Sequence, residues 1–128
     1  MPAYTVGTDL VEVGRVRKSC ERQTFIKRVY ADVEMEYFST KRDPAESMAG
    51  CWAAKEAFGK SLGTGVRGFA MNEVAVVHDE LGCPHLQFSG AAKELVSRLG
   101  AEFSLSITHT SEYAAATVIA FHNNKNDS

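Results

Sequence analysis

The chain has 128 residues, a length that fits one domain with its own hydrophobic core. It is 45% hydrophobic and 23% charged with a formal net charge of -2, a composition typical of soluble proteins that argues against a general nucleic-acid binder. Its three cysteines form neither a zinc-binding pattern nor a disulfide framework, as expected in a reducing compartment. With no signal peptide and no apolar run of about 18 residues, we expect a cytoplasmic protein that does not enter a membrane.

The first third of the chain is predicted to form a strand followed by helices. Residues 4–10 alternate in polarity and favour a strand, whereas apolar residues recur at helical spacing over residues 11–22. Two shorter helices are expected over residues 25–30 and 32–38.

A long helix comes next. Asp43 can cap its first turn, Pro44 suits the first helical position, and Glu46 completes a capping box. Gly63 fits the position just beyond its end. An apolar face is expected from Met48, Ala49, Trp52, Ala53 and Ala57.

The second half predicts strands over residues 74–78 and 84–88, a helix over 90–99, and a hairpin of strands 103–108 and 113–121. The polar residues 122–128 are expected to be a disordered tail, which leaves residues 1–121 as the domain. This order of elements predicts an α+β fold with a mainly antiparallel sheet, one long helix and several short ones.

Two groups of residues indicate phosphoryl chemistry. Asp9 follows Gly7 and Thr8 near the end of the first strand, where it could bind a metal or merely cap a helix. Glu56 and Lys60 lie one helical turn apart, as a Mg²⁺ ligand and a phosphate-binding cation, or simply as a surface ion pair. The loop after this helix can bring backbone N–H groups to a ligand; its residues are Ser61, Leu62, Gly63, Thr64 and Gly65.

Two further features have a functional and a structural interpretation. His109 ends a predicted strand, where it could bind phosphate, accept a proton, or be held structurally in a turn. Arg15, Lys18 and Arg22 recur at helical spacing and could bind an acidic partner, or form a solvated helix face.

These motifs together resemble the holo-acyl-carrier-protein synthase family, the small 4′-phosphopantetheinyl transferases. The resemblance covers residues 4–121 and rests on three blocks: residues 6–15, Phe38 with residues 49–65, and residues 106–110 followed by 113–116. Gly82-Cys83-Pro84 also resembles the family's Gly-x-Pro hairpin. The chain departs from the family at Cys51-Trp52, where Arg-Phe is more common, and at Thr110, where many members are acidic.

The resemblance implies transfer of the phosphopantetheine arm of coenzyme A to a serine of apo-acyl carrier protein, for fatty acid biosynthesis. It implies a homotrimer with sites between subunits. Glu56, a metal-bound water or His109 could be the general base, and we favour Glu56 or a water that it orients. The resemblance gives roles to particular positions: Asp9 and Glu56 as Mg²⁺ ligands, Lys60 and His109 at the phosphates, Ser61, Gly63, Thr64, Gly65 and Pro84 at the nucleotide, and Arg15, Lys18 and Arg22 at the acidic carrier.

Other functions stay open at this stage. A chain of this fold could bind coenzyme A or another nucleotide without transferring anything, although its proposed metal and phosphate ligands are all present. It could also be a structural, trimer-forming domain, or a transferase that serves a polyketide or peptidyl carrier.

Overall fold

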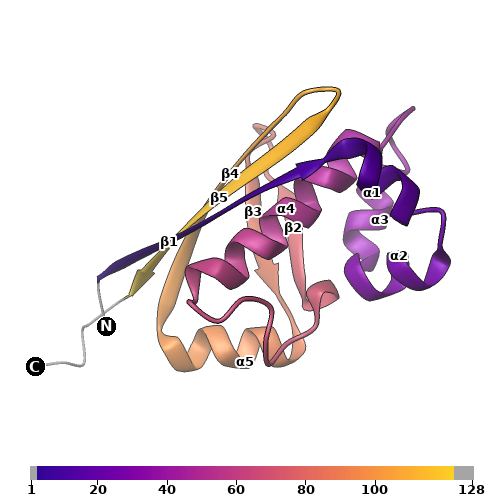
Figure 1. Ribbon diagram of the computed structural model, residues 1–128. Coiled ribbons are helices and arrows are strands. Elements are labelled where there is room, and N and C mark those ends of the chain that lie inside the picture. The colour runs from indigo at the N-terminus through magenta and orange to yellow at the C-terminus, as the bar shows by residue number, and fades with distance from the viewer. Residues whose placement is uncertain (1–2, 123–128) are drawn as a thin grey trace, which may run out of the picture.

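The computed structural model describes residues 3–122 and arranges them around one long helix (Figure 1). The elements follow one another as β1 (Tyr4–Glu12), α1 (Val13–Ser19), α2 (Gln23–Val29), α3 (Asp32–Phe38), α4 (Ala45–Ser61), the 3-10 helix η1 (Met71–Glu73), β2 (Val74–His78), β3 (Pro84–Phe88), α5 (Gly90–Leu99), β4 (Ala101–His109) and β5 (Tyr113–His122). This is the α+β fold with antiparallel sheets that the sequence predicts.

Two antiparallel sheets surround α4. The larger sheet has the order β1-β5-β4, and the smaller one pairs β2 with β3. Helix α4 packs lengthwise against β1 and β5, while α1, α2 and α3 gather near its N-terminal half and α5 lies near its C-terminal end (Figure 1). Because α4 is enclosed from several directions, it is buried over most of its circumference, unlike the one-sided amphipathic helix that the sequence predicts.

Contact between β1 and α4 depends on Gly7. A Cβ atom on Gly7 would collide with the carbonyl oxygen of Ala57 and would lie 2.5 Å from the backbone nitrogen of Ser61. The strand and the helix therefore touch backbone to backbone, which only glycine permits at this position. The same contact brings Asp9, two residues along β1, to the last two turns of α4.

Several predicted boundaries need correction. The helix expected over residues 11–22 is present but shorter. β1 continues through Glu12 by pairing with Tyr113, and α1 covers only Val13–Ser19. Sheet pairing across the chain overrides the local helical spacing there. Helix α4 begins at Ala45, whose N–H donates to Asp43 Oδ1, so Pro44 is the flanking residue rather than the first helical one.

Other predicted elements are confirmed. The structure contains the predicted strands over 74–78 and 84–88 and the helices over 32–38 and 90–99. Gly63 follows the C-cap of α4 with φ of 79°, and its N–H donates to the carbonyl of Lys60. His122, placed in the predicted tail, is a buried residue of β5, and residues 123–128 of that tail lie outside the described residues.

No helix among residues 3–122 is both long enough and apolar enough to cross a membrane.

Candidate active site

Asp9 and Lys60 meet where β1 crosses the last turn of α4. The Lys60 ammonium lies 3.0 Å from Asp9 Oδ1 and donates a second hydrogen bond of 3.1 Å to the carbonyl of Thr8. The Asp9 side chain is 16% exposed, whereas that of Lys60 is 52% exposed. The ammonium is therefore held at the strand but still reaches solvent, where it could meet an anionic ligand.

Glu56 adds a second carboxylate to this pair. It lies one turn before Lys60 on α4, and it lines the same cavity as Asp9. Burial raises the pKa of Glu56 above its usual value, and the negative charge of Asp9 raises that pKa further, while Lys60 opposes both. Two carboxylates that repel each other beside a cavity are suited to a divalent cation.

The side chains at this site fit a metal ion that is coordinated partly by the protein and partly by a substrate. Within residues 3–122 no group of three or more His, Cys, Asp or Glu side chains is arranged to hold a metal ion. Mg²⁺ is usually held by one or two carboxylates together with waters and substrate phosphates. Asp9 and Glu56 could supply the carboxylates of such a site.

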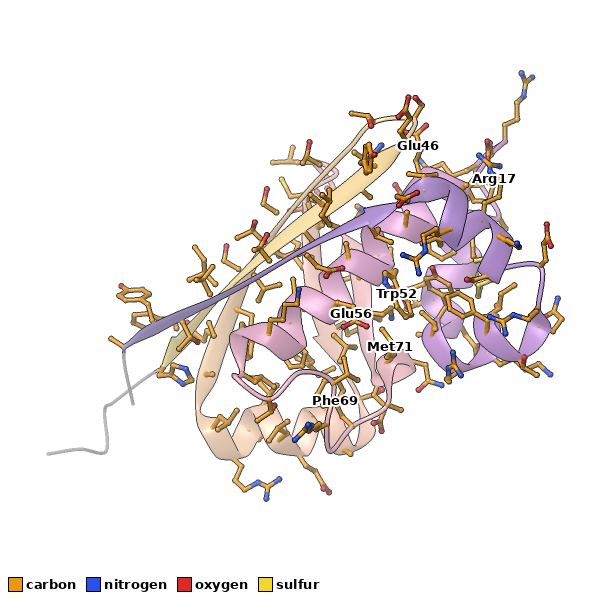
Figure 2. All side chains as sticks on the ribbon, in the orientation of Figure 1. Arg17, Glu46, Trp52, Glu56, Phe69 and Met71 are labelled. Atoms are coloured by element: carbon orange, nitrogen blue, oxygen red, sulfur yellow. The ribbon has the colours of Figure 1, made fainter. Side chains whose placement is uncertain are left out.

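A cavity of about 250 Å³ opens beside the two carboxylates. Phe25 and Trp52 form an aromatic wall, with ring centroids 5.5 Å apart. Trp52 lies one turn before Glu56 on α4, so the aromatic wall and the carboxylate lie along the same side of the helix (Figure 2). Phe25 and Trp52 were not predicted as site residues, although the spacing of Trp52 to Glu56 indicates a shared face.

Basic residues continue from this cavity across the surface. Arg15 lines the cavity with Asp9 and Glu56, and it also lines a shallower neighbouring cavity with Lys18 and Arg22. Arg22 lies at the N-cap of α2 rather than on α1, so the three cations come from two helices instead of one stripe. They nevertheless border one continuous region next to the carboxylates.

The loop after α4 folds back on the helix. The N–H of Gly65 donates to the carbonyl of Gly59, and a Cβ on Gly59 would lie 2.6 Å from the carbonyl carbon of Gly65. Gly63 and Gly65 have φ of 79° and 69°, and Thr64 Oγ1 donates to the carbonyl of Gly65. The loop therefore starts close to Lys60 in a conformation that requires glycine.

The side chain of Ser61 does not face the ligand side of the loop, although the sequence predicts it among the nucleotide-binding residues. It is buried, and its hydroxyl donates a 2.7 Å hydrogen bond to the carbonyl of Phe58 inside α4. This placement does not favour the predicted role of the Ser61 side chain at the nucleotide.

His109 and Pro84 lie in a different part of the chain. Nδ1 of His109 is 2.8 Å from Oε1 of Glu46, at the N-terminal end of α4, which Figure 2 labels far from Glu56. His109 and Pro84 line a second cavity of about 270 Å³, together with Tyr37, Lys41 and His78. Since Lys60 lies fourteen positions after Glu46 on α4, the two are about 21 Å apart along the helix. One chain thus does not bring His109 and Lys60 together at one phosphate group.

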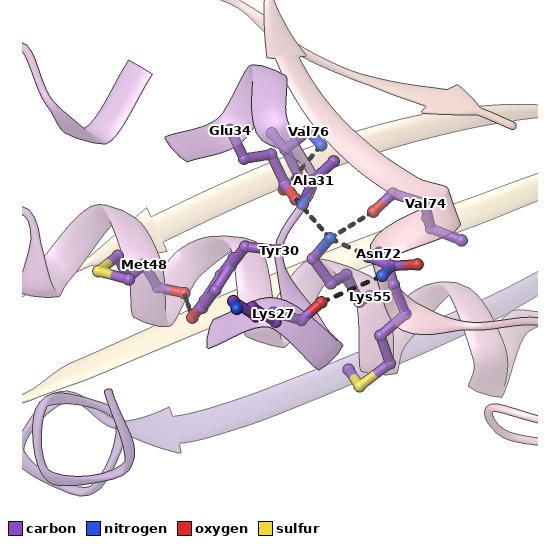
Figure 3. A network of polar contacts seen from close by, with 10 residues as sticks. Lys27, Tyr30, Ala31, Glu34, Met48, Lys55, Asn72, Val74 and Val76 are labelled. Carbon is purple, nitrogen blue, oxygen red and sulfur yellow. Dashed lines mark hydrogen bonds and ion pairs between the residues drawn. The ribbon is translucent and has the colours of Figure 1, made fainter. Parts of the chain in front are cut away.

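A buried ion pair that was not among the predicted site residues lies beneath the site. Lys55 adjoins Glu56 in sequence but points into the interior, where its ammonium lies 2.6 Å from Oε1 of Glu34 (Figure 3). Both side chains are fully buried. Burial lowers the pKa of Lys55, and the negative charge of Glu34 opposes that shift. The alanines around Lys55 are the one sequence signal that this charge lies in the core.

Comparisons with known proteins show the family of this chain. The model of the 4′-phosphopantetheinyl transferase superfamily matches residues 5–118. A holo-[acyl-carrier-protein] synthase of Thermoanaerobacter sp. (strain X514) is 41% identical over 125 residues, which cover 96% of this chain and 91% of that protein.

Two solved structures have the same fold. The crystal structure of holo-[acyl-carrier-protein] synthase from Neisseria meningitidis superposes with a TM-score of 0.83 at 32% identity, covering 91% of this chain and 96% of that one. The ACPS–CoA complex of Chronobacterium ammoniagenes gives a TM-score of 0.84 at 30% identity, covering 95% and 99%.

Proposed function

Because this chain belongs to the 4′-phosphopantetheinyl transferase superfamily, we propose that it transfers the phosphopantetheine arm of coenzyme A to a serine of apo-acyl carrier protein. The products are holo-acyl carrier protein, for fatty acid biosynthesis, and adenosine 3′,5′-bisphosphate. The observation that carries the proposal is the meeting of Asp9 and Glu56 at one cavity, with Lys60 paired to Asp9. It is supported by the similar structure in which coenzyme A is bound.

Asp9 and Glu56 would hold Mg²⁺ in this proposal. When bound there, the ion supplies positive charge to the pyrophosphate of coenzyme A. Lys60 adds a second positive charge next to Asp9. The N–H groups of Gly63 and Gly65 donate to carbonyls of α4, so these two glycines shape the loop rather than supply donors to phosphate oxygens.

Glu56 is our choice for the general base. The serine oxygen of the carrier bonds to the phosphorus that bears the pantetheine arm, and the bond from this phosphorus to the bridging oxygen breaks. Adenosine 3′,5′-bisphosphate leaves, and Glu56 takes the serine proton directly or through a water. Glu56 lines the cavity together with Arg15 of the proposed carrier surface, so a serine brought there would come near its carboxylate.

The carrier would dock on Arg15, Lys18 and Arg22. These cations lie next to the cavity that Asp9 and Glu56 line. An acidic helix of the carrier could therefore contact the cations while the carrier serine beside that helix reaches Glu56.

We further propose a homotrimer with shared active sites. In the part of the chain that the structure describes, α4 covers one face of the β1-β5-β4 sheet, and large apolar side chains remain exposed on the other. Such a patch indicates association. The side chains are 39–67% exposed and belong to Tyr4, Val6, Leu10, Tyr113, Ile119 and Phe121.

A site shared between two copies of the chain would also explain why His109 and Lys60 lie far apart within one copy. A neighbouring copy could bring its His109 and Pro84 to the Lys60 of the first, so that the second cavity receives the nucleotide end of the same coenzyme A. We place the enzyme in the cytoplasm, where its free thiols, Cys20, Cys51 and Cys83, stay reduced.

Intact-mass spectrometry of an apo-acyl carrier protein tests the function directly. Incubation with this protein, coenzyme A and Mg²⁺ is expected to add about 340 Da, the mass of one phosphopantetheine arm, and a chelator is expected to prevent the gain. Asp9→Asn is expected to abolish it. Asp43→Asn removes the charge of the exposed pair with Arg17 and leaves an amide oxygen that can still accept the N–H of Ala45, so it is expected to keep the gain. No gain with any fatty acid, polyketide or peptidyl carrier, despite bound coenzyme A, would identify a binding module instead.

A further inference from the structure

Lys55 is a buried lysine to which the proposed reaction gives no role. Its ammonium donates to Oε1 of Glu34 at 2.6 Å, to the carbonyl of Val74 at 2.6 Å and to the carbonyl of Met71 at 3.1 Å. An ammonium has three N–H donors, so all of them are satisfied within the protein. Figure 3 shows Lys55 reaching from α4 toward Glu34 and Val74.

Glu34 completes the network from the other side. Its Oε1 also accepts the N–H of Ala31, and its Oε2 accepts the N–H of Val76. A fully buried ion pair carries a large desolvation cost, and apolar residues of similar volume often stabilise a core as well or better. Stability alone is therefore a weak reason for a lysine here. Lys55 gives the buried carbonyl of Val74 a donor and adds a second donor to the carbonyl of Met71, which also accepts the N–H of Val74.

Those two carbonyls lie where the loop over residues 62–70 ends. The loop leaves α4 at Ser61 and is held to the helix at its start by the bond from Gly65 to Gly59. It ends at η1, where the carbonyl of Met71 accepts from Lys55. Lys55 thus ties the end of the loop to the same helix that carries Glu56 and Lys60.

The other side-chain bonds of η1 lead elsewhere. Asn72 donates to the carbonyl of Lys27 on α2, and Glu73 accepts the N–H of Ala91 on α5. These bonds hold η1 to the outer helices. Toward α4, the end of the loop is held by the packing of Phe69 on Phe58 and by the polar bond from Lys55.

We propose that Lys55 is a positioning residue for the loop that binds the phosphates of coenzyme A. By holding the Met71 and Val74 carbonyls to α4, it sets where residues 62–70 end and so the path of the loop relative to Lys60. Glu34 balances its charge and fixes α3 and β2 around it. The role in coenzyme A binding rests on the proposed function, whereas the effect on the loop does not.

Two variants separate this role from simple loss of the ion pair. Lys55→Met and Glu34→Gln both remove the pair, but only Lys55→Met removes the donors to the Met71 and Val74 carbonyls. Isothermal titration is expected to show coenzyme A affinity weakened about tenfold or more by Lys55→Met and less than about threefold by Glu34→Gln. Equal losses in the two variants would overturn the proposal.

Steady-state kinetics give a second readout. Lys55→Met is expected to raise KM for coenzyme A more than it lowers kcat, when assayed well below its melting temperature. Val118→Ala, a core truncation on β5, is the control for destabilisation alone and is expected to leave KM unchanged. A KM increase of the same size in Val118→Ala would contradict the positioning role.

Hydrogen exchange tests the loop without any reaction. Peptides over residues 62–73 are expected to exchange faster in Lys55→Met than in Glu34→Gln or Val118→Ala. If Lys55→Met does not fold, Lys55→Gln replaces it, since two N–H groups cannot serve three acceptors and the same ranking is expected. Unchanged exchange overturns the proposal even in an active enzyme, while faster exchange in a protein that transfers nothing refutes only the proposed function.

Discussion

The geometry of the active site depends on the absence of a side chain at Gly7. The backbone of β1 approaches α4 so closely that a Cβ has no room, and this approach places Asp9 beside Glu56 and Lys60. The spacing of Gly7 to Asp9 is therefore a packing requirement as well as a chemical one.

Gly7→Ala is expected to destabilise the protein by about 2–3 kcal/mol or more and to abolish transfer, since the added methyl must push β1 away from α4. Urea unfolding and the intact-mass assay measure the two effects. Gly14→Ala is the matched control, because a Cβ there meets nothing within 4 Å and is expected to leave stability equal or slightly higher. Equal stability of Gly7→Ala and wild type would refute the close approach.

Glu56 is expected to cost stability in the free protein at neutral pH. Its pKa is raised by burial and by Asp9, so the folded state disfavours the ionised form that the unfolded chain adopts. This cost is absent below the ordinary pKa of a glutamate and grows as pH rises through the raised pKa of the folded protein.

Glu56→Gln is therefore expected to raise the melting temperature at pH 7 and to lose that advantage as pH falls toward 4, while transfer is abolished. Scanning calorimetry across this range measures it. Glu94→Gln, on the exposed face of α5, serves as the control and is expected to show no such trend. An equal gain at every pH would show that charge at Glu56 is not the cause.

At the scale of elements, the first two helices combine a structural and a binding face. Val13, Val16, Phe25 and Val29 turn inward, while Arg15, Lys18 and Arg22 surround a surface cavity next to the carboxylates. Arg17 is held apart by its bidentate pair with Asp43, with both N···O distances at 3.0 Å.

Lys18→Glu is expected to raise KM for the acidic carrier about five- to tenfold and to leave coenzyme A affinity unchanged. The effect is expected to shrink at high salt, because the contact is exposed. Arg98→Glu on α5 makes the same charge change far from the site, and its kinetics are expected to match wild type. A loss confined to coenzyme A binding would reject carrier docking on this surface.

At the scale of the whole molecule, two half-sites lie at opposite ends of α4. Asp9, Glu56 and Lys60 gather near its C-terminal half, and His109 pairs with Glu46 at its start. The exposed apolar face of the β1-β5-β4 sheet offers a surface on which copies can associate and join these halves.

Complementation tests the shared site. Asp9→Asn and His109→Ala are each expected to be inactive, and a refolded equal mixture is expected to regain about a quarter of wild-type activity, because random assembly joins two intact halves in that fraction of sites. A mixture that stays inactive would show that each site belongs to one chain. Val6→Glu with Ile119→Glu is expected to yield the 14.0 kDa monomer in light scattering and to prevent any recovery.

The sequence by itself determined the local parts of this protein. The strand with Asp9, the one-turn spacing of Glu56 and Lys60, the glycine at the end of α4 and most later elements follow from periodicity and backbone preferences among residues close in the chain. These features also carried the resemblance to the transferase family, which the comparisons confirm.

Only the tertiary structure decided how these parts relate to one another. It extended β1 through Glu12 by pairing it with a strand about a hundred residues away, buried Lys55 against Glu34, and placed His109 far from Lys60. Each outcome depends on contacts between distant segments, whose free energy exceeds the preferences of any short stretch. For this reason the chemistry of the site could be predicted from nearby residues, but its supports and its division along α4 could not.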